Sequence, residues 1–434
     1  MLNYYFTLAW RSIHNQRGLS FLISSTLGLG IAACTITFAL IYLMSSDPVP
    51  GKSDRIFRVQ MDNWSPNAAA IAPDLPPEEV SWRDANNIVD AHKAKYQSAS
   101  AITWGMVTPQ EDNITPFLGL VRVTNGEFFP MFRLPFLYGE AWDNYAANEA
   151  EYVVVLSKET NDKLFQGENS VGRTVPMLGS LFTVVGVLDE WHPTPKFYDL
   201  SYGAFYKVED MYIPLGLKPT LELPHGGVYN CWETDLDDGY QTFFSSECTN
   251  FQLWVELEDN QDITEYSQYI DTYVQQQKAL GRFPRPMNNQ LFDLPQWLQY
   301  KNVVGNDIYL FFWLSFLFLL VCLFNAASLL STSFINKTKE VAVRRALGAS
   351  QENMLSQFFI ETLILGVMGG IVGLLLSVVG LEGIKLLYPR YAPLIHLDVT
   401  LISFTFFLSL VSSAIAGTIP MFKVCNLPPA QQLK

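Results

Sequence analysis

The chain has 434 residues, of which 49% are hydrophobic and 16% are charged. Ordinary soluble domains carry roughly 25% charged residues, so this composition excludes an ordinary soluble protein and favours a membrane protein. The formal net charge of −14 argues against a nucleic acid as partner, because phosphate binding requires a basic face.

The first predicted element is an N-terminal segment, 1–18. Its apolar residues recur at the spacing of one helix face, and Arg11 and Arg17 stand toward its end. This pattern predicts an amphipathic helix that lies on the inner membrane surface and contacts membrane lipids. The alternative is that the segment extends the first membrane span into the cytoplasm.

Four long runs contain no charged residue: Leu19–Met44, Ile308–Asn336, Thr362–Leu381 and Val399–Phe422. A helix needs about 20 apolar residues to cross the hydrocarbon core. The runs therefore predict four transmembrane helices, at 19–46, 306–336, 351–388 and 399–422. The first run is longer than the roughly 7 to 15 apolar residues of a cleavable signal peptide, so it is expected to remain as an anchor.

Between the first two spans lies a predicted folded domain, 47–305, outside the cytoplasm. Its sequence alternates strand patterns, such as "RIFRVQM" at 55–61, with helical ones, and a strand at 153–156 leads into a helix that Ser157 can cap. The expected class is α+β, with two subdomains interleaved in sequence and the inserted one at about 106–230. This domain holds most of the acidic residues, which either attract cationic ligands or only keep the domain solvated.

Basic residues flank the spans mainly on one side. They precede the first span, lie between the second and third, and follow the fourth, whereas Lys385 and Arg390 in the predicted outer loop, 389–398, go against the trend. The positive-inside rule makes the basic side cytoplasmic. Both termini, including the tail 423–434, are therefore expected inside, with the large domain outside.

Two of the five cysteines, Cys231 and Cys248, lie in the outer domain. In an oxidising compartment they can form one disulfide, and the sequence leaves open whether they do. The five histidines are scattered and no CxxC pair occurs, so no metal site is expected.

Small residues recur at four-residue spacing within two spans. Such stripes let helices approach closely, either within one subunit or between subunits. The stripes are Ser24, Gly28 and Ala32 in the first span, and Gly366 with Gly370 and Gly369 with Gly373 in the third. Asn325 is the main deep polar residue, and we expect it to form an interhelical hydrogen bond. No charged residue occupies the middle of a span, which disfavours ion-coupled transport.

The segment "EVAVRRALGAS", Glu340–Ser350, predicts a short cytoplasmic helix within 337–350, between two spans. Glu340 and Arg344 are one turn apart and can pair, Val341, Val343, Ala346 and Leu347 offer apolar contacts, and Gly348 suits the left-handed position that ends a helix. Ser350 can cap the next helix. Such a helix would lie against lipid headgroups or dock on a protein partner.

The stretch 336–376, "NKTKEVAVRRALGASQENMLSQFFIETLILGVMGGIVGLLL", resembles the permease signature of the MacB and FtsX type of ABC transporter. The outer segments "VTNGEFFPMFRLPFLYGEAW" and "VVVLSKETNDKLF" resemble the MacB-type periplasmic core domain. The resemblance implies a coupling helix that docks on a cytoplasmic ABC ATPase, formed by Glu340, Val341, Arg344, Arg345, Ala346, Leu347 and Gly348. Gln357 and Glu361 match family positions just beyond it.

The resemblance further implies a dimer with a second permease copy or a paralogue, in the inner membrane of a bacterium, with a periplasmic adaptor protein as a further candidate partner. The sequence departs from MacB itself in lacking a G-x-x-x-x-G-K-[ST] phosphate loop. No cofactor is therefore expected in this chain, and ATP and Mg²⁺ would be bound by a separate ATPase.

The function expected from this resemblance is that of a non-catalytic permease subunit that exports a peptide, lipid or lipoprotein through movements of its periplasmic domain. The alternative is an FtsX-like signalling device that regulates a periplasmic enzyme without transport. An enzymatic outer domain is disfavoured, because the sequence has no G-x-S-x-G or HExxH motif.

Overall fold

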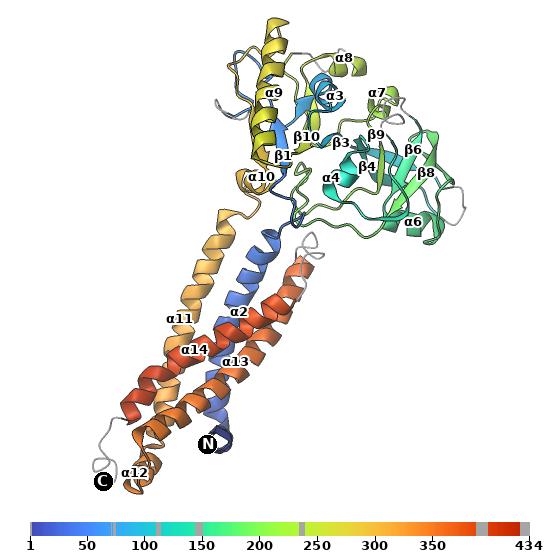
Figure 1. Ribbon diagram of the computed structural model, residues 1–434. Helices are drawn as coiled ribbons and strands as arrows, with labels where there is room; N and C mark the ends of the chain where they lie inside the picture. The colour runs from blue at the N-terminus through green and yellow to red at the C-terminus, as the bar shows by residue number, and fades with distance from the viewer. Residues whose placement is uncertain are drawn as a thin grey trace. The chain divides into compact units, whose positions relative to one another are not determined.

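The computed structural model describes residues 2–70, 72, 75–109, 114–143, 151–233, 239–387 and 398–425. The chain forms two compact units, which are described separately (Figure 1). The membrane unit comprises Met1–Ser45 and Val304–Lys434, and the outer unit comprises Ser46–Val303. Most of the predicted outer loop, 389–398, and of the tail, 423–434, lies outside the described residues.

Six helices of the membrane unit are described: α1 (Leu2–Asn15), α2 (Arg17–Met44), α11 (Asn306–Ile335), α12 (Thr338–Ala346), α13 (Gln351–Leu387) and α14 (Val399–Cys425). Four of them, α2, α11, α13 and α14, are long and apolar enough to cross a membrane, as the uncharged runs predict. These four pack as a bundle in which α2 contacts the other three (Figure 1).

The outer unit is built on a mixed sheet of eleven strands. In chain order they are β1 (Ile56–Gln60), β2 (Val80–Ser81), β3 (Tyr96–Val107), β4 (Phe117–Thr124), β5 (Phe136–Gly139), β6 (Val153–Leu156), β7 (Thr174–Met177), β8 (Ser180–Leu188), β9 (Met211–Pro214), β10 (Thr249–Glu256) and β11 (Gln290–Asp293). The order across the sheet is β11-β1-β10-β3-β4-β9-β6-β8-β5, with β2 on β10 and β7 on β3 and β8.

The segment 106–230 supplies one half of this order. Strands β4, β9, β6, β8 and β5 come from it, whereas β11, β1, β10 and nearly all of β3 lie outside it. The halves join through the antiparallel β3–β4 ladder, and they share one compact unit. The segment expected to be an inserted subdomain thus forms one half of a continuous sheet, and its status as a separate subdomain stays a prediction.

Within its described residues, the outer unit has seven helices around this sheet: α3 (Trp82–Asp90), α4 (Phe128–Phe132), α6 (Lys158–Phe165), α7 (Leu217–Thr220), α8 (Tyr240–Ser245), α9 (Asn260–Ala279) and α10 (Leu294–Tyr300). Ser157 caps α6 by accepting a hydrogen bond from the Thr160 amide, as predicted. Asp293 and Gln296 form a capping box at the start of α10.

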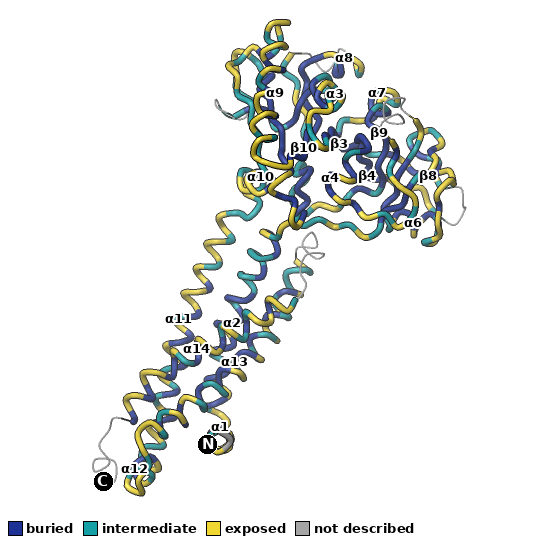
Figure 2. Tube along the Cα trace, in the orientation of Figure 1, coloured by how far each residue is buried: buried dark blue, intermediate teal, exposed yellow. Residues whose placement is uncertain are grey.

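Strand alternation separates two cores on opposite faces of the sheet. On β10, Leu253 and Val255 face an aliphatic core to which α3 and α9 contribute, while Trp254 between them faces an aromatic core. That second core, here called the aromatic face, receives side chains from α4 and α10, including Phe128 and Trp297. Strands β1 and β10 are accordingly buried along their whole length, and Figure 2 colours them dark blue.

Candidate functional site

The predicted coupling segment forms α12, a two-turn helix between α11 and α13. Gly348 has a φ of +100°, and the Gly348 and Ala349 amides donate to the carbonyls of Arg345 and Arg344, both at 3.1 Å. These two bonds are those of a Schellman motif, which ends the helix. Ser350 then caps α13 by accepting from the Asn353 amide at 3.2 Å. The stop and the restart predicted from the sequence are both confirmed.

One face of α12 is fixed to the bundle. Val341 and Ala342 are buried. Arg344 donates to the Gln357 side chain of α13 at 2.9 Å and also pairs with Glu340. Arg345 donates to the carbonyl of Cys425, at the end of α14, at 3.1 Å. A displacement of α12 would therefore pull on two membrane helices.

A buried carboxylate extends this attachment. Glu361 on α13 is 2% exposed, accepts a hydrogen bond from the Ser12 hydroxyl of α1 at 3.0 Å, and pairs with Lys337, which immediately precedes α12. A second hydrogen bond also joins the N-terminal segment to the membrane helices. The hydroxyl of Ser333, near the end of α11, donates to the side chain of Gln16, which follows α1, at 2.8 Å. Sequence reasoning singled out Glu361 only through the family resemblance. Its partner Ser12 lies 349 residues away, which no local pattern can reveal.

The opposite face of α12 presents apolar side chains. Val343 is 49% exposed and Leu347 is 83% exposed, and Ala346 between them is exposed as well. Of the four residues expected to offer apolar contacts, Val341 is buried against the bundle, and these three are exposed. At three- and four-residue spacing they form one continuous strip, here called the apolar edge.

The small residues of α13 divide between two neighbouring helices. A Cβ on Gly369 would lie 3.2 Å from the Leu27 Cβ of α2, and one on Gly373 would lie 2.9 Å from the side chain of Ile31. On the α2 side of this contact, Gly28 faces Val372, Ser24 donates to the Leu365 carbonyl at 3.4 Å, and Ala32 is buried. The stripe thus serves packing within the subunit.

The second stripe of α13 faces α14. Gly366 and Gly370 lie against Ser413 and Ser409, and the Ser409 hydroxyl donates to the Gly366 carbonyl. The two serines were not predicted as packing residues. Their four-residue spacing is the same as that of the two glycines, and this pattern in the sequence could have identified them as helix-packing residues.

Asn325 is the deep polar residue of α11. It lies on the exposed side of α11, whereas its neighbour Ala326 is buried. The expected interhelical hydrogen bond stays a prediction, because this position faces away from the other helices of the chain. The reason is helical phase, because α11 turns its buried positions, such as Cys322, Ala326 and Leu330, toward the bundle.

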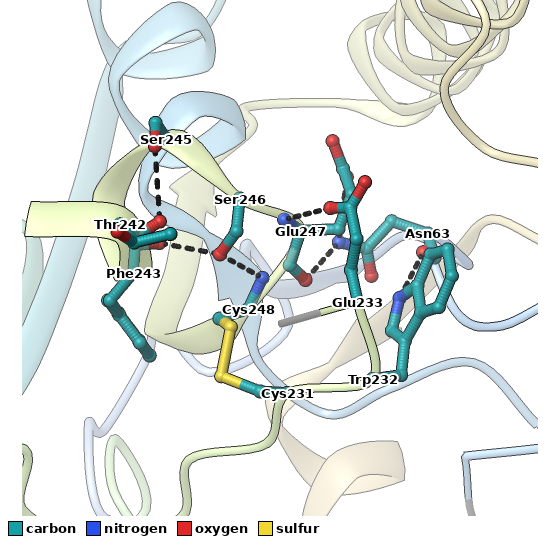
Figure 3. Close-up of a disulfide and its surroundings, with 10 residues drawn as sticks. All are labelled: Asn63, Cys231, Trp232, Glu233, Thr242, Phe243, Ser245, Ser246, Glu247 and Cys248. Atoms are coloured by element: carbon teal, nitrogen blue, oxygen red, sulfur yellow. Dashed lines mark hydrogen bonds between the residues drawn. A yellow bond between two sulfur atoms is a disulfide. The ribbon is translucent and has the colours of Figure 1, made fainter. Parts of the chain in front are cut away.

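Cys231 and Cys248 are joined by a disulfide in the outer unit (Figure 3). The bridge fastens the loop before α8 to the start of β10. Beside it the Trp232 indole donates to the Asn63 carbonyl at 3.1 Å, and the Glu247 amide donates to Glu233 at 3.1 Å. Across the described residues, no group of histidine, cysteine and acidic side chains could hold a metal ion.

A buried charge network, not predicted from the sequence, lies on the aromatic face. Arg122 donates to Asp199 and Glu209, both at 2.6 Å, and Lys196 reaches Glu209 at 2.8 Å. Burial alone would raise the pKa of Glu209, but the charges of Arg122 and Lys196 lower it to about 2. Each of these four groups is thus paired with an opposite charge inside the outer unit.

Comparisons with known proteins cover both units. The family model described as the MacB-like periplasmic core domain matches residues 20–273, and that of the FtsX-like permease C-terminal matches residues 312–429. The uncharacterized ABC transporter permease YvrN of Bacillus subtilis is 22% identical, over 71% of this chain and 68% of its own.

Several relatives are named macrolide export ATP-binding/permease protein MacB. The one from Pasteurella multocida is 25% identical over 75% of this chain, and the one from Aggregatibacter actinomycetemcomitans is 24% identical over 58%. The matches span 46% and 34% of those relatives, so the chain matches less than half of their length.

Among solved structures, the periplasmic region of MacB from Actinobacillus actinomycetemcomitans aligns with a TM-score of 0.37 at 13% identity, over 61% of this chain and 98% of that one. The extracellular domain of YknZ from Gram-positive bacteria aligns with a TM-score of 0.34 at 14% identity, over 55% of this chain and 99% of that one. The two family matches assign the chain: it belongs to the MacB/FtsX-type family of ABC transporter permeases.

Proposed function

We propose that this chain is the permease subunit of an ABC transporter in a bacterial inner membrane, with both termini in the cytoplasm, and that α12 is its coupling helix. A separate ABC ATPase would bind ATP and Mg²⁺ and dock on α12. Its closure would move the membrane helices and, through them, the periplasmic domain, so as to export a peptide, lipid or lipoprotein.

The observation that carries this proposal is the division of α12 into two faces. One face is held by Arg344, Arg345 and the buried Val341, so the helix cannot move without α13 and α14. The other face exposes the apolar edge, which includes Leu347 at 83% exposure. An exposed apolar strip on a rigid element is typical of a protein contact.

The division also refines the roles that the resemblance assigns. Arg344 and Arg345 donate hydrogen bonds to other residues of the permease. We therefore assign them to transmitting the movement of α12 to the membrane helices. Val343, Ala346 and Leu347 are assigned to the ATPase contact. Val343 is an addition to the residues that the resemblance implied.

A docking test follows from Leu347. In Leu347→Asp, a charged side chain replaces the leucine of the apolar edge, which is 83% exposed. We expect the amount of ATPase that co-purifies with the permease in mild detergent to fall by about tenfold or more, as for an interface hot spot. ATP hydrolysis stimulated by the permease should fall in parallel. Quantitative mass spectrometry and a phosphate-release assay measure the two effects.

The matched control is Leu280→Asp, which places the same charge at a leucine 76% exposed in the outer unit. It should retain the ATPase and its stimulated activity. Unaltered co-purification and hydrolysis in Leu347→Asp would refute α12 as the docking helix.

We further propose a second permease copy that faces α11. Asn325 is a polar side chain on the exposed side of an apolar membrane helix. An amide left in hydrocarbon without a hydrogen bond is costly, and an equivalent residue on a facing helix would satisfy it.

A further inference from the structure

A cavity of about 140 Å³ lies in the outer unit, on the aromatic face of the sheet. The charged residues that line it come from four separate segments: Arg58 of β1, Glu78 and Glu79 before β2, Asp199 in the loop after β8, and Lys301 at the end of α10. Arg58, Glu79 and Asp199 are each at most 4% exposed, so the cavity has a buried polar wall.

Arg58 is incompletely bonded in this wall. Its Nη2 donates to the Glu78 carbonyl at 2.6 Å, and its guanidinium lies 5.2 Å from the ring centre of Trp297. Its Nε and Nη1 are buried and have no hydrogen-bond partner among the described residues. Buried donors of a charged group that stay unsatisfied are costly, so these two favour an acceptor in the cavity.

Among the charged pairs around the cavity, Arg58 has the longest contact, an ion pair with Glu79. Lys301 neutralises Glu78 at 2.6 Å, and Arg122 neutralises Asp199 at 2.6 Å. Glu79 is 3.8 Å from Arg58, beyond hydrogen-bond distance, and its burial raises its pKa to about 8 despite the attraction of Arg58. Burial therefore favours the protonated form of Glu79, and an anion beside Arg58 would balance the guanidinium.

The size and the remaining lining restrict the anion. The volume is close to the roughly 150 Å³ of a cavity that holds benzene, which corresponds to about six heavy atoms. Trp297 and Val228 add apolar surface to the lining. We infer that this cavity binds a small organic carboxylate, whose carboxylate group accepts hydrogen bonds from Arg58 and whose short carbon chain contacts Trp297 and Val228. This inference is independent of the proposed coupling function.

Isothermal titration calorimetry of the full chain in detergent at pH 7 tests the inference, with propionate as probe. We expect saturable binding of one propionate per chain. Propionamide has nearly the same shape without the charge, and we expect it to bind at least about tenfold more weakly, as for the loss of a charge-assisted hydrogen bond.

Two variants locate the site. Arg58→Met removes the proposed anchor and should weaken propionate binding by about tenfold or more. Val228→Trp keeps every charge and fills the cavity, so it should also abolish binding, and it serves as the test if Arg58→Met fails to fold. Arg173→Met, which removes an arginine whose side chain is 48% exposed and does not line this cavity, is the matched control and should bind like the wild type.

Three results would overturn the inference. The first is the absence of saturable propionate binding to the folded wild type at tens of millimolar. The second is equal affinity for propionamide, which would remove the carboxylate requirement. The third is unchanged binding to folded Val228→Trp, which would place the bound propionate elsewhere.

Discussion

At the scale of single residues, Lys218 of the outer unit shows how burial of a side chain makes folding stability depend on pH. Its side chain is fully buried, and its ammonium donates to the Pro224 carbonyl at 3.2 Å. Burial lowers the pKa of Lys218 from its ordinary 10.5 to about 7. Between these two pH values the unfolded chain binds more protons at this residue than the folded chain, so stability should rise with pH across that window.

Lys218→Met should remove this rise. Below pH 7 the variant should be more stable than the wild type, by on the order of a few kcal/mol, because no buried ammonium has to be desolvated. Denaturant unfolding of the full chain followed by tryptophan fluorescence, at several pH values between about 6 and 10, measures the effect.

Lys93→Met, at an exposed lysine, is the control for the loss of a positive charge and should keep the wild-type pH dependence. If Lys218→Met also keeps it, Lys218 is not the titrating group.

At the scale of elements, α13 packs closely against two neighbouring helices of the bundle. Its stripe of Gly369 and Gly373 lies against α2, and its stripe of Gly366 and Gly370 lies against α14. In lipid, close packing takes over the role that the hydrophobic effect has in soluble cores. A side chain in either stripe must therefore separate two helices.

Gly369→Leu should destabilise the bundle by about 1–3 kcal/mol, the usual cost of overpacking. The control on the same helix is Gly383→Leu, because a Cβ at Gly383 would have no atom within 4 Å. Thermal unfolding of both variants in the same detergent provides the comparison. Equal melting temperatures would show that the α2–α13 contact is looser than the structure indicates.

At the scale of the whole molecule, the proposed second copy facing α11 gives a crosslinking prediction. Asn325→Cys should form a disulfide between two chains in membranes, because residue 325 would lie at the shared interface. Val379→Cys, at a residue 70% exposed on α13, is the control and should remain uncrosslinked. Non-reducing electrophoresis distinguishes the two.

Crosslinking of Val379→Cys but not of Asn325→Cys would move the interface to α13. The three cysteines of the membrane unit, Cys34, Cys322 and Cys425, are buried and should contribute little background.

Properties that depend on neighbours in the chain were determined by the sequence alone. The four membrane spans follow from uncharged runs, since crossing a membrane depends on local hydropathy and length. The end of α12 at Gly348 and the caps at Ser157 and Ser350 follow from side chains that bond within a few residues. The family could be predicted from the sequence because its motifs occur in a fixed order along the chain.

Only the tertiary structure decided which side chains meet. It paired Glu361 with Ser12, directed Arg345 to the end of α14, and left Asn325 outside the bundle. It also brought Arg58 and Trp297 to one cavity. Each of these outcomes depends on the phase and packing of elements far apart in sequence, and a local pattern of residues does not encode that geometry.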